Sequence, residues 1–228
     1  MKLRKTLVSA VLKLIIRIFC RIDTKALKDI PLDGPMIICI NHINFLDAPM
    51  FLVFLEPRIV RGFTKKETWD NPLFSFLANT YDSISVDRGT ADLKAFREVA
   101  NTMKAGHFIC MAPEGTRSGT GVLQEGKPGV VTMALTTGAP LLPLAHYGTE
   151  HLWENLKRLK RTRITFKAGD PIYLTPPKKT NPEIRKKIMD EFMYHLALLL
   201  PEELRGVYGD LSLATQEYLD IRSEPVPE

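Results

Sequence analysis

The residues that decide the fold are Met36-Ile37-Ile38-Cys39-Ile40-Asn41-His42-Ile43-Asn44-Phe45-Leu46-Asp47. The first five are apolar and mostly β-branched, a pattern that predicts a buried strand. The segment 48–55 carries a proline near its start and continues apolar, as a helix does. The sequence therefore predicts a strand, a loop and a helix in succession.

His42 follows this predicted strand, and Asp47 follows His42 by five residues. An imidazole takes up a proton near neutral pH, and an aspartate bonded to its other nitrogen fixes the tautomer. Of the five histidines in the chain, only His42 has a carboxylate at this offset. The pair predicts a general base with its orienting acid, but on these residues alone a histidine that caps a loop is the favoured alternative.

Composition sets the broad class of the protein. A chain of 228 residues that is 45% hydrophobic is long enough for one domain with a full core. The three cysteines are scattered through apolar runs, which predicts buried thiols in a reducing compartment and neither a disulfide framework nor a metal site. The formal charge of +5 is unevenly spread, because residues 1–30 are basic and residues 201–228 are acidic. The amino-terminal end is therefore expected to meet an anionic surface.

Residues 1–22 predict an amphipathic helix. At 100° per residue a narrow polar stripe faces a broad apolar surface, and the stripe consists of Lys2, Thr6, Ser9, Lys13, Arg17 and Arg21. Charges interrupt the apolar run, so it is too short to span a bilayer, and it lacks the cleavage site of a signal peptide. A helix lying in a membrane interface is favoured over a core helix with a solvated edge. We expect residues 1–29 to form this membrane-association segment and a linker.

The rest of the chain alternates between predicted strands and helices. Strands are expected at 36–40, 58–63, 83–86, 107–111, 141–145 and 164–168, and helices at 48–55, 71–78, 90–104, 129–137 and 182–200. This order predicts an α/β fold, a single domain with a largely parallel central sheet flanked by helices. The domain is expected to occupy residues 30–200, and residues 201–228 to form an acidic tail.

Chemically informative residues follow several of the predicted strands. His42, Lys65, Arg88 and Glu114 each come after a strand. In open α/β sheets ligands bind at the carboxyl ends of the strands. These four side chains are therefore expected to converge on one edge of the sheet.

Four blocks, in this order, resemble those of the glycerolphosphate acyltransferase family, most closely its 1-acylglycerol-3-phosphate O-acyltransferase branch. The first is Asn41-His42-x4-Asp47. The second, Ser85-Val86-Asp87-Arg88, has Ser85 where the family usually has an aromatic residue. The third and fourth are Pro113-Glu114-Gly115-Thr116-Arg117-Ser118 and Ala139-Pro140-Leu141-Leu142-Pro143-Leu144. A lysine-bearing segment, Thr64-Lys65-Lys66-Glu67, lies between the first two blocks. The resemblance covers residues 30–170, and nothing in residues 171–228 adds to it.

The resemblance implies transfer of a fatty acyl group from acyl-CoA or an acyl carrier protein to the sn-2 hydroxyl of 1-acylglycerol-3-phosphate. His42 is then the general base and Asp47 orients it. The acceptor-binding residues are Asn41, Lys65, Arg88, Glu114, Gly115, Thr116, Arg117 and Lys127, in which the arginines fork around phosphate oxygens and Glu114 bonds the glycerol hydroxyls. Neither a metal nor a cofactor is required.

The implied partners are a lysophospholipid, the thioester donor and a membrane surface, on whose cytoplasmic face the protein is expected to be peripheral or monotopic. Three alternatives remain open. The acceptor is another lysophospholipid or an ornithine lipid; or the chain is a non-catalytic lipid-binding module, against which the intact His42–Asp47 pair speaks; or the basic cluster at 157–163 binds nucleic acid. That cluster has no aromatic interleaving, so no nucleic-acid partner is expected.

Overall fold

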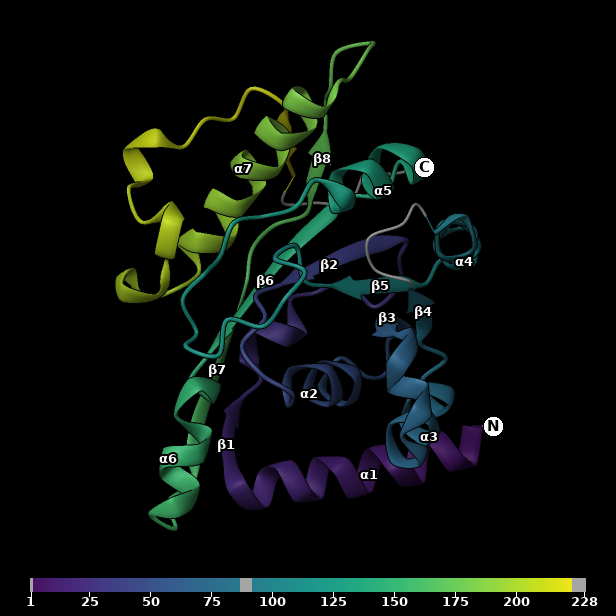
Figure 1. Cartoon of the computed structure of the whole chain (residues 1–228), viewed down its shortest axis with the longest axis vertical. Helices are drawn as coiled ribbons and strands as arrows, with labels where there is room; N and C mark the ends of the chain where they lie inside the picture. Colours follow the sequence, from purple (N-terminus) through teal and green to yellow (C-terminus); the bar gives the residue numbers. More distant parts are fainter. Residues whose placement is uncertain (1, 87–91, 223–228) are drawn as a thin grey trace.

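The computed structural model describes residues 2–86 and 92–222. Within them, nine strands form one sheet, in the order β1-β7-β6-β2-β5-β3-β4, with β8 paired to β6 and β9 to β8. The strands are β1 Cys20–Asp23, β2 Met36–Ile40, β3 Val60–Lys65, β4 Ile84–Val86, β5 Phe108–Met111, β6 Leu141–Tyr147, β7 Thr162–Ala168, β8 Ile172–Leu174 and β9 Leu219–Ile221. The sheet is the frame on which the helices and the site are placed (Figure 1).

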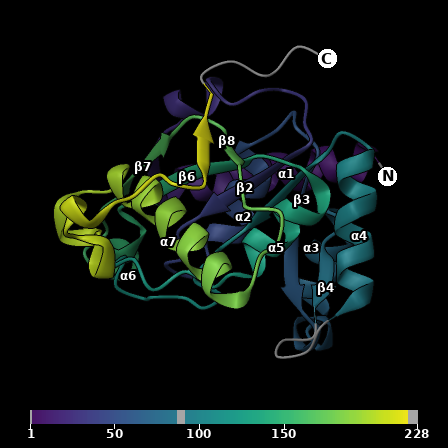
Figure 2. The ribbon, with the colours of Figure 1, turned by 90° about the horizontal axis from the view of Figure 1, so that it is seen from above.

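Helices connect the strands and cover the sheet (Figure 1). The α-helices are α1 Lys2–Phe19, α2 Asp47–Phe54, α3 Pro72–Thr80, α4 Leu93–Lys104, α5 Gly129–Thr137, α6 Leu152–Lys157 and α7 Pro182–Leu198. Short 3₁₀ helices are η1 Lys25–Lys28, η2 Lys66–Asp70, η3 Thr149–His151, η4 Glu202–Leu204, η5 Gly206–Tyr208 and η6 Leu211–Leu213. Figure 2 shows α4 at the right-hand edge of the molecule.

Five adjacent strands, β6-β2-β5-β3-β4, run parallel. β7 is antiparallel to β6, and β1 lies parallel to β7 at the sheet edge. All five residues of β2 are buried, because helices cover both faces of the sheet. Ile37 and Cys39 pack in one core cluster with α4, α5 and α7, whereas Ile38 and Ile40 pack in a second cluster with α1 and α2. The predicted α/β fold with a largely parallel central sheet is confirmed.

Local sequence signals place several helix ends. Asn71 and Asn181 cap α3 and α7 by accepting backbone N–H groups, and each is followed by a proline at the first helical position. α5 ends at Thr137 and is followed by Gly138, whose φ of 70° lies in the left-handed region. α4 begins later than predicted, since Asp92 caps it by accepting the Ala95 N–H, while Thr90 lies outside the described residues.

The amino-terminal segment differs from the prediction at its end. The expected helix forms, but it ends at Phe19, and residues 20–23 form β1 in place of a last helical turn. The following segment, predicted to be a linker, is packed, because the Arg58 guanidinium donates to the carbonyls of Leu27, Ile30 and Pro31. Pairing with β7, which lies about 140 residues away in sequence, outweighs the local helical pattern.

The acidic carboxyl-terminal segment also joins the fold as far as it is described. β9 pairs with β8, Tyr208 is buried, and the carboxylate of Glu191 on α7 accepts the backbone N–H groups of Glu217 and Tyr218. The predicted boundaries at residues 30 and 201 therefore do not coincide with a break in the sheet. The short elements β8, β9 and α6 were not predicted.

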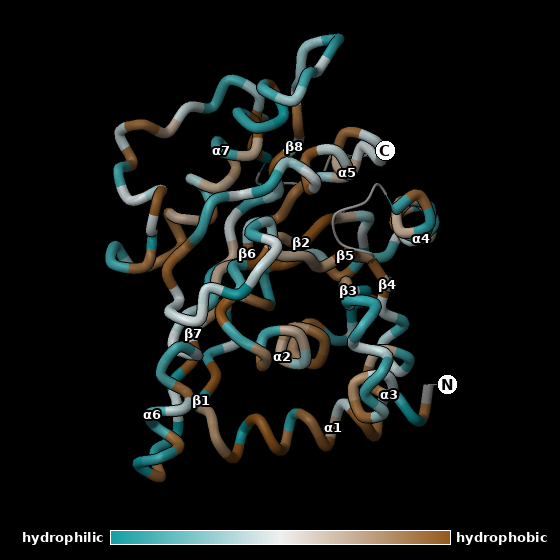
Figure 3. Tube along the Cα trace, in the orientation of Figure 1, coloured by the Kyte–Doolittle hydropathy of each residue, from teal (hydrophilic) through white to brown (hydrophobic). Residues whose placement is uncertain are grey.

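α1 keeps much of its apolar surface exposed. Figure 3 shows hydrophobic residues along α1 as well as in the central strands. Ile16 is buried against the core, whereas the exposed large apolar residues of this helix are Leu3, Leu7, Val11, Leu14, Ile15, Ile18 and Phe19. Among the described residues, none of the helices has the length and apolar content that a bilayer crossing requires.

Candidate active site

The predicted site residues gather at the carboxyl ends of the parallel strands. His42 follows β2, Lys65 ends β3, and residues 113–118 follow β5. The loops after β2 and β5 are bonded to one another on both sides of His42. Its backbone N–H donates to Glu114 Oε1 at 2.6 Å, and its carbonyl accepts the Ser118 N–H at 2.8 Å. A third bond joins Gly119 N–H to the Ile43 carbonyl at 3.0 Å.

His42 and Asp47 are in direct contact. The His42 Nδ1 lies 2.8 Å from Asp47 Oδ2, and this oxygen also accepts the backbone N–H groups of Ile43 and Asn44 at 2.7 and 3.0 Å. Asp47 is the first residue of α2, where the helix dipole favours a carboxylate. The five-residue spacing thus closes a loop in which the aspartate binds both the imidazole and the backbone between them.

The second oxygen of Asp47 has a partner that the sequence did not reveal. Asp47 Oδ1 lies 2.9 Å from Nε2 of His146, near the end of β6, and both side chains are fully buried. The signal was present, since His146 follows the predicted strand 141–145 as His42 follows 36–40. No carboxylate follows His146 at the spacing that links His42 to Asp47, and its partner Asp47 lies 99 residues away in sequence.

Burial by itself raises the pKa of the Asp47 carboxyl, but hydrogen bonds from His146 and His42 together outweigh it and hold that pKa well below its ordinary value. Asp47 is therefore an anion and a pure acceptor at neutral pH, so His42 donates through Nδ1–H. The lone pair of His42 then resides on Nε2, on the side of the ring away from Asp47. The His42 side chain is 19% exposed, so its ring is accessible from outside the protein.

Glu114 braces two loops of the site. Besides the His42 N–H, its carboxylate accepts the backbone N–H of Gln124 at 2.9 Å, and it is 1% exposed. Burial raises the pKa of this carboxyl, although these hydrogen bonds oppose the shift. Both oxygens hold the two loops together, and the contact with glycerol hydroxyls stays a prediction. Gln124, which the sequence did not single out, is the second anchor of this brace.

Asn41 is likewise bonded within the protein, and its predicted acceptor contact stays a prediction. Its side-chain amide donates to the His146 carbonyl and accepts the His146 N–H, both at 2.8 Å, and it is 1% exposed. The amide joins the end of β2 to the end of β6, where it replaces the backbone ladder that stops at Ile40. Asn41 therefore fixes the separation of the two strands that carry His42 and His146.

A cavity of about 350 Å³ lies beside the third block and is lined by Glu114, Thr116, Gln124, Glu125, Gly126, Lys127, Pro128 and Lys186. Lys127 is exposed, and its ammonium group lies over Gly115, where an added Cβ would be 3.3 Å from Nζ. Gly115 has φ of 71°, a left-handed conformation that glycine adopts without strain. Lys186, on α7, was not predicted; it is bonded to Glu125 and Asp190. Thr116 and Lys127 therefore line one cavity, and Gly115 lies beside the Lys127 side chain.

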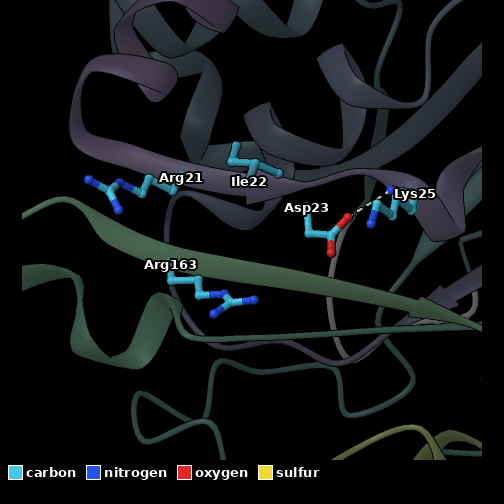
Figure 4. Close-up of a pocket in the computed structure, with 5 residues that line it drawn as sticks. All are labelled: Arg21, Ile22, Asp23, Lys25 and Arg163. Atoms are coloured by element: carbon cyan, nitrogen blue, oxygen red, sulfur yellow. Dashed lines mark hydrogen bonds between the residues drawn. The ribbon is translucent and has the colours of Figure 1, made fainter.

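The remaining predicted cations are spread more widely. Arg117 is exposed in the loop after β5, and Lys65 is exposed at the end of β3. Arg88 lies outside the described residues, together with the preceding aspartate of its block. A second cavity, of about 330 Å³, is far from this set in the sheet order; Figure 4 shows it between β1 and β7, lined by Arg21, Ile22, Asp23, Lys25 and Arg163.

Comparisons with known proteins agree with this architecture. The family model described as Acyltransferase matches residues 21–147. A 1-acyl-sn-glycerol-3-phosphate acyltransferase of Cocos nucifera is 34% identical over 136 residues, which are 58% of this chain and 44% of the relative. One of Bacillus subtilis (strain 168) is 26% identical over 146 residues, 64% of this chain and 71% of the relative.

The chain spans about half the length of the plant relatives it matches. The crystal structure of the 1-acyl-sn-glycerophosphate acyltransferase PlsC from Thermotoga maritima has the same fold, with a TM-score of 0.63 at 23% identity over 82% of this chain and 76% of that one. The matched region contains β2, the His42–Asp47 loop, the third block and most of the parallel sheet. The chain therefore belongs to the acyltransferase family.

Proposed function

We propose that this protein transfers a fatty acyl group from a thioester donor, acyl-CoA or acyl carrier protein, to the sn-2 hydroxyl of 1-acylglycerol-3-phosphate, giving phosphatidic acid. The observation that carries the proposal is the His42–Asp47 pair, in which a buried anion fixes the histidine tautomer and leaves Nε2 free. The names of the relatives favour this acceptor over other alcohols.

In this proposal the acceptor hydroxyl attacks the thioester carbonyl directly. His42 Nε2 removes the hydroxyl proton as the new C–O bond forms, and Asp47 stabilises the resulting imidazolium. When the C–S bond breaks, the imidazolium returns the proton to the leaving thiolate. His42 ends neutral, so no enzyme nucleophile and no cofactor are needed.

The acceptor phosphate needs cationic partners, and the cavity beside the third block supplies them. Lys127 and Thr116 line this cavity, which lies next to the Glu114 brace under His42. We assign Arg117, Lys65 and Arg88 to the same anion on the basis of the family blocks. Charge-assisted hydrogen bonds of this kind contribute about 1.5–3 kcal/mol each.

An assay of purified protein on a panel of acceptors tests the function. The panel contains 1-acylglycerol-3-phosphate, lysophosphatidylethanolamine, lysophosphatidylcholine and a lyso-ornithine lipid, each with both thioester donors. We expect preferential acylation of 1-acylglycerol-3-phosphate. Preferred acylation of another acceptor would identify that acceptor as the substrate. If no acceptor is acylated faster than by the His42→Ala protein, the lipid-binding alternative is supported.

We expect Arg88→Ala to raise the acceptor KM about ten- to a hundredfold, because the phosphate does not react and its binding is felt mainly in the ground state. The donor KM should change little. Arg88→Lys should recover only part of the loss, since an ammonium group cannot make a forked contact. Steady-state kinetics with donor and acceptor varied separately measure this. A defect confined to the donor KM would place Arg88 against phosphates of the donor.

We also propose that α1 holds the protein on a membrane, as a peripheral or monotopic protein on the cytoplasmic face. Its exposed apolar row is continued by Leu73, Phe74 and Phe76 on α3, and Arg4 of α1 lies over the Phe76 ring. Figure 1 shows α1 and α3 along the same side of the molecule. Cations near the end of α1, around the cavity of Figure 4, suit anionic lipid headgroups.

Deleting residues 2–22 would remove β1 from the sheet, so side-chain substitutions test the membrane contact better. We expect the combined variant Leu7→Ser, Leu14→Ser and Ile18→Ser to lower affinity for phosphatidylglycerol-containing vesicles by more than about tenfold, because each apolar side chain contributes about 1.5–3 kcal/mol when buried. The matched control replaces three exposed apolar residues of the carboxyl-terminal part, Leu198, Val207 and Leu213, with serine. Equal loss in a co-sedimentation assay for both variants would contradict the assignment to α1.

A further inference from the structure

His146 occupies a fully buried position in the catalytic region without access to substrate. Its ring packs edge-on against Phe51, with centroids 5.1 Å apart at 85°, and lies 6.3 Å from the Phe166 ring. Its backbone N–H and carbonyl are both held by Asn41. The imidazole is thus fixed by packing from α2 and β7, and the His146 backbone is held by the residue that follows β2.

We propose that His146 is a positioning residue for acyl transfer, which holds the Asp47 carboxylate in the orientation that in turn orients His42. The contact is its Nε2, 2.9 Å from Asp47 Oδ1, and it leaves Oδ2 to His42 and the loop backbone. The kinetic consequences of this inference rest on the proposed function. The orientation of Asp47 and the position of the His146 proton rest on the geometry alone.

The other ring nitrogen of His146 indicates where its proton lies. Nδ1 is buried and has no hydrogen-bond partner among residues 2–86 and 92–222. A proton on Nδ1 would be an unpaired buried N–H beside aromatic rings. The ring proton therefore lies on Nε2, which donates a hydrogen bond to Asp47 Oδ1. Asp47 keeps its other oxygen for His42.

Removing this donor changes the surroundings of His42. With Oδ1 unpaired, the carboxylate is no longer held in its orientation, so its contact with the His42 imidazole is altered. Two other titratable groups face this pair. The Cys110 thiol on β5 is neutral, because burial, assisted by the charge of Asp47, raises its pKa to about 12. Glu114 contacts the His42 backbone N–H. From β7 the neighbour is the apolar ring of Phe166.

Two variants separate hydrogen bonding from packing. His146→Gln places an amide N–H close to the position of Nε2 but loses the ring, whereas His146→Phe keeps a ring against Phe51 and loses the donor. If His146 positions Asp47, the Phe variant should lose about 10- to 100-fold in kcat with little change in either KM, because the base is misplaced. The Gln variant should stay within a few fold of wild type. The reverse order, Phe active and Gln impaired, would overturn the proposal in favour of packing.

The pH profile adds a readout that packing does not move. Because Asp47 contacts the His42 ring, a displaced carboxylate should move the acid limb of the activity profile in His146→Phe, whereas the limb should stay in place in His146→Gln. Thermal unfolding shows whether each variant folds. If a variant does not fold, the nuclear magnetic resonance spectrum of the wild-type protein decides.

Nuclear magnetic resonance of protein labelled with ¹⁵N-histidine tests the same inference without any substrate. In wild type, the His146 ring should show the Nε2–H tautomer, with Nδ1 unprotonated. Its signals are assigned by their loss in the Gln variant. An Nδ1–H tautomer would overturn the proposal. If wild type fails to acylate 1-acylglycerol-3-phosphate while the spectra match, the proposed substrate is wrong and the positioning of His42 stands.

Discussion

Replacing His42 with alanine should lower acyl transfer by about 10²–10⁴-fold, the usual contribution of general base catalysis. The acceptor hydroxyl would then have to lose its proton to water during attack. The His42 ring contacts Asp47 and is partly exposed, whereas its backbone makes the bonds that join the two loops. The variant should therefore keep its fold, its vesicle binding and its KM values, and lose kcat.

His151→Ala is the matched control, because the His151 side chain is 64% exposed and lies on η3. This variant should keep wild-type turnover. Initial rates with purified, folded proteins measure both. A His42→Ala protein that retains a substantial fraction of wild-type turnover would mean that another group takes the proton.

Asp47→Asn should impair activity nearly as severely and, unlike His42→Ala, should also reduce stability. The amide offers one oxygen in place of two anionic ones, so donors from His42, His146, Ile43 and Asn44 cannot all be satisfied. An unpaired buried donor costs about 1–3 kcal/mol, which gives an expected loss of about 2–4 kcal/mol in the free energy of unfolding. Urea denaturation measures it, with the exposed Asp70→Asn as control.

The pH dependence of this difference follows from the low pKa of Asp47 in the folded protein. An aspartate in the unfolded chain has a pKa of about 3.9. Because folding lowers the pKa of Asp47, the stabilisation by its ionised form is complete above that value and is lost as pH falls further towards the folded pKa. The gap in unfolding free energy between wild type and Asp47→Asn should narrow as pH falls below about 4. A gap that widens below this pH would contradict the assignment of a buried anion.

The sequence was informative where physical signals are local. Unbroken apolar runs bounded by turns predict β2, β5 and β6, and asparagine–proline pairs mark the starts of α3 and α7. The His42–Asp47 contact follows from spacing within one loop. Because parallel strands share an edge, the positions of Lys65 and the 113–118 loop at that edge also follow from strand order.

Other features depend on pairing between distant segments. β1, β8 and β9 are three or four residues long, too short for a periodic pattern, and they form because neighbouring strands offer free edges. Asn41 and Glu114 have residue types typical of ligand binding, yet distant backbone groups occupy their polar atoms. His146 is related to Asp47 only through the register of β2 and β6. Such contacts have no counterpart in the local sequence.

The bonds on both sides of His42 have a consequence for substrate selection. The loop that carries the histidine is tied to the loop after β5 through its own N–H and carbonyl, and to α2 through Asp47. The His42 imidazole is therefore preorganised, and in the proposed reaction acyl donors of different chain length would meet it in the same position. Discrimination between a short and a long acyl chain would then take place where the far end of the chain is accommodated, so it could evolve by changes in distant apolar residues without altering the chemical step.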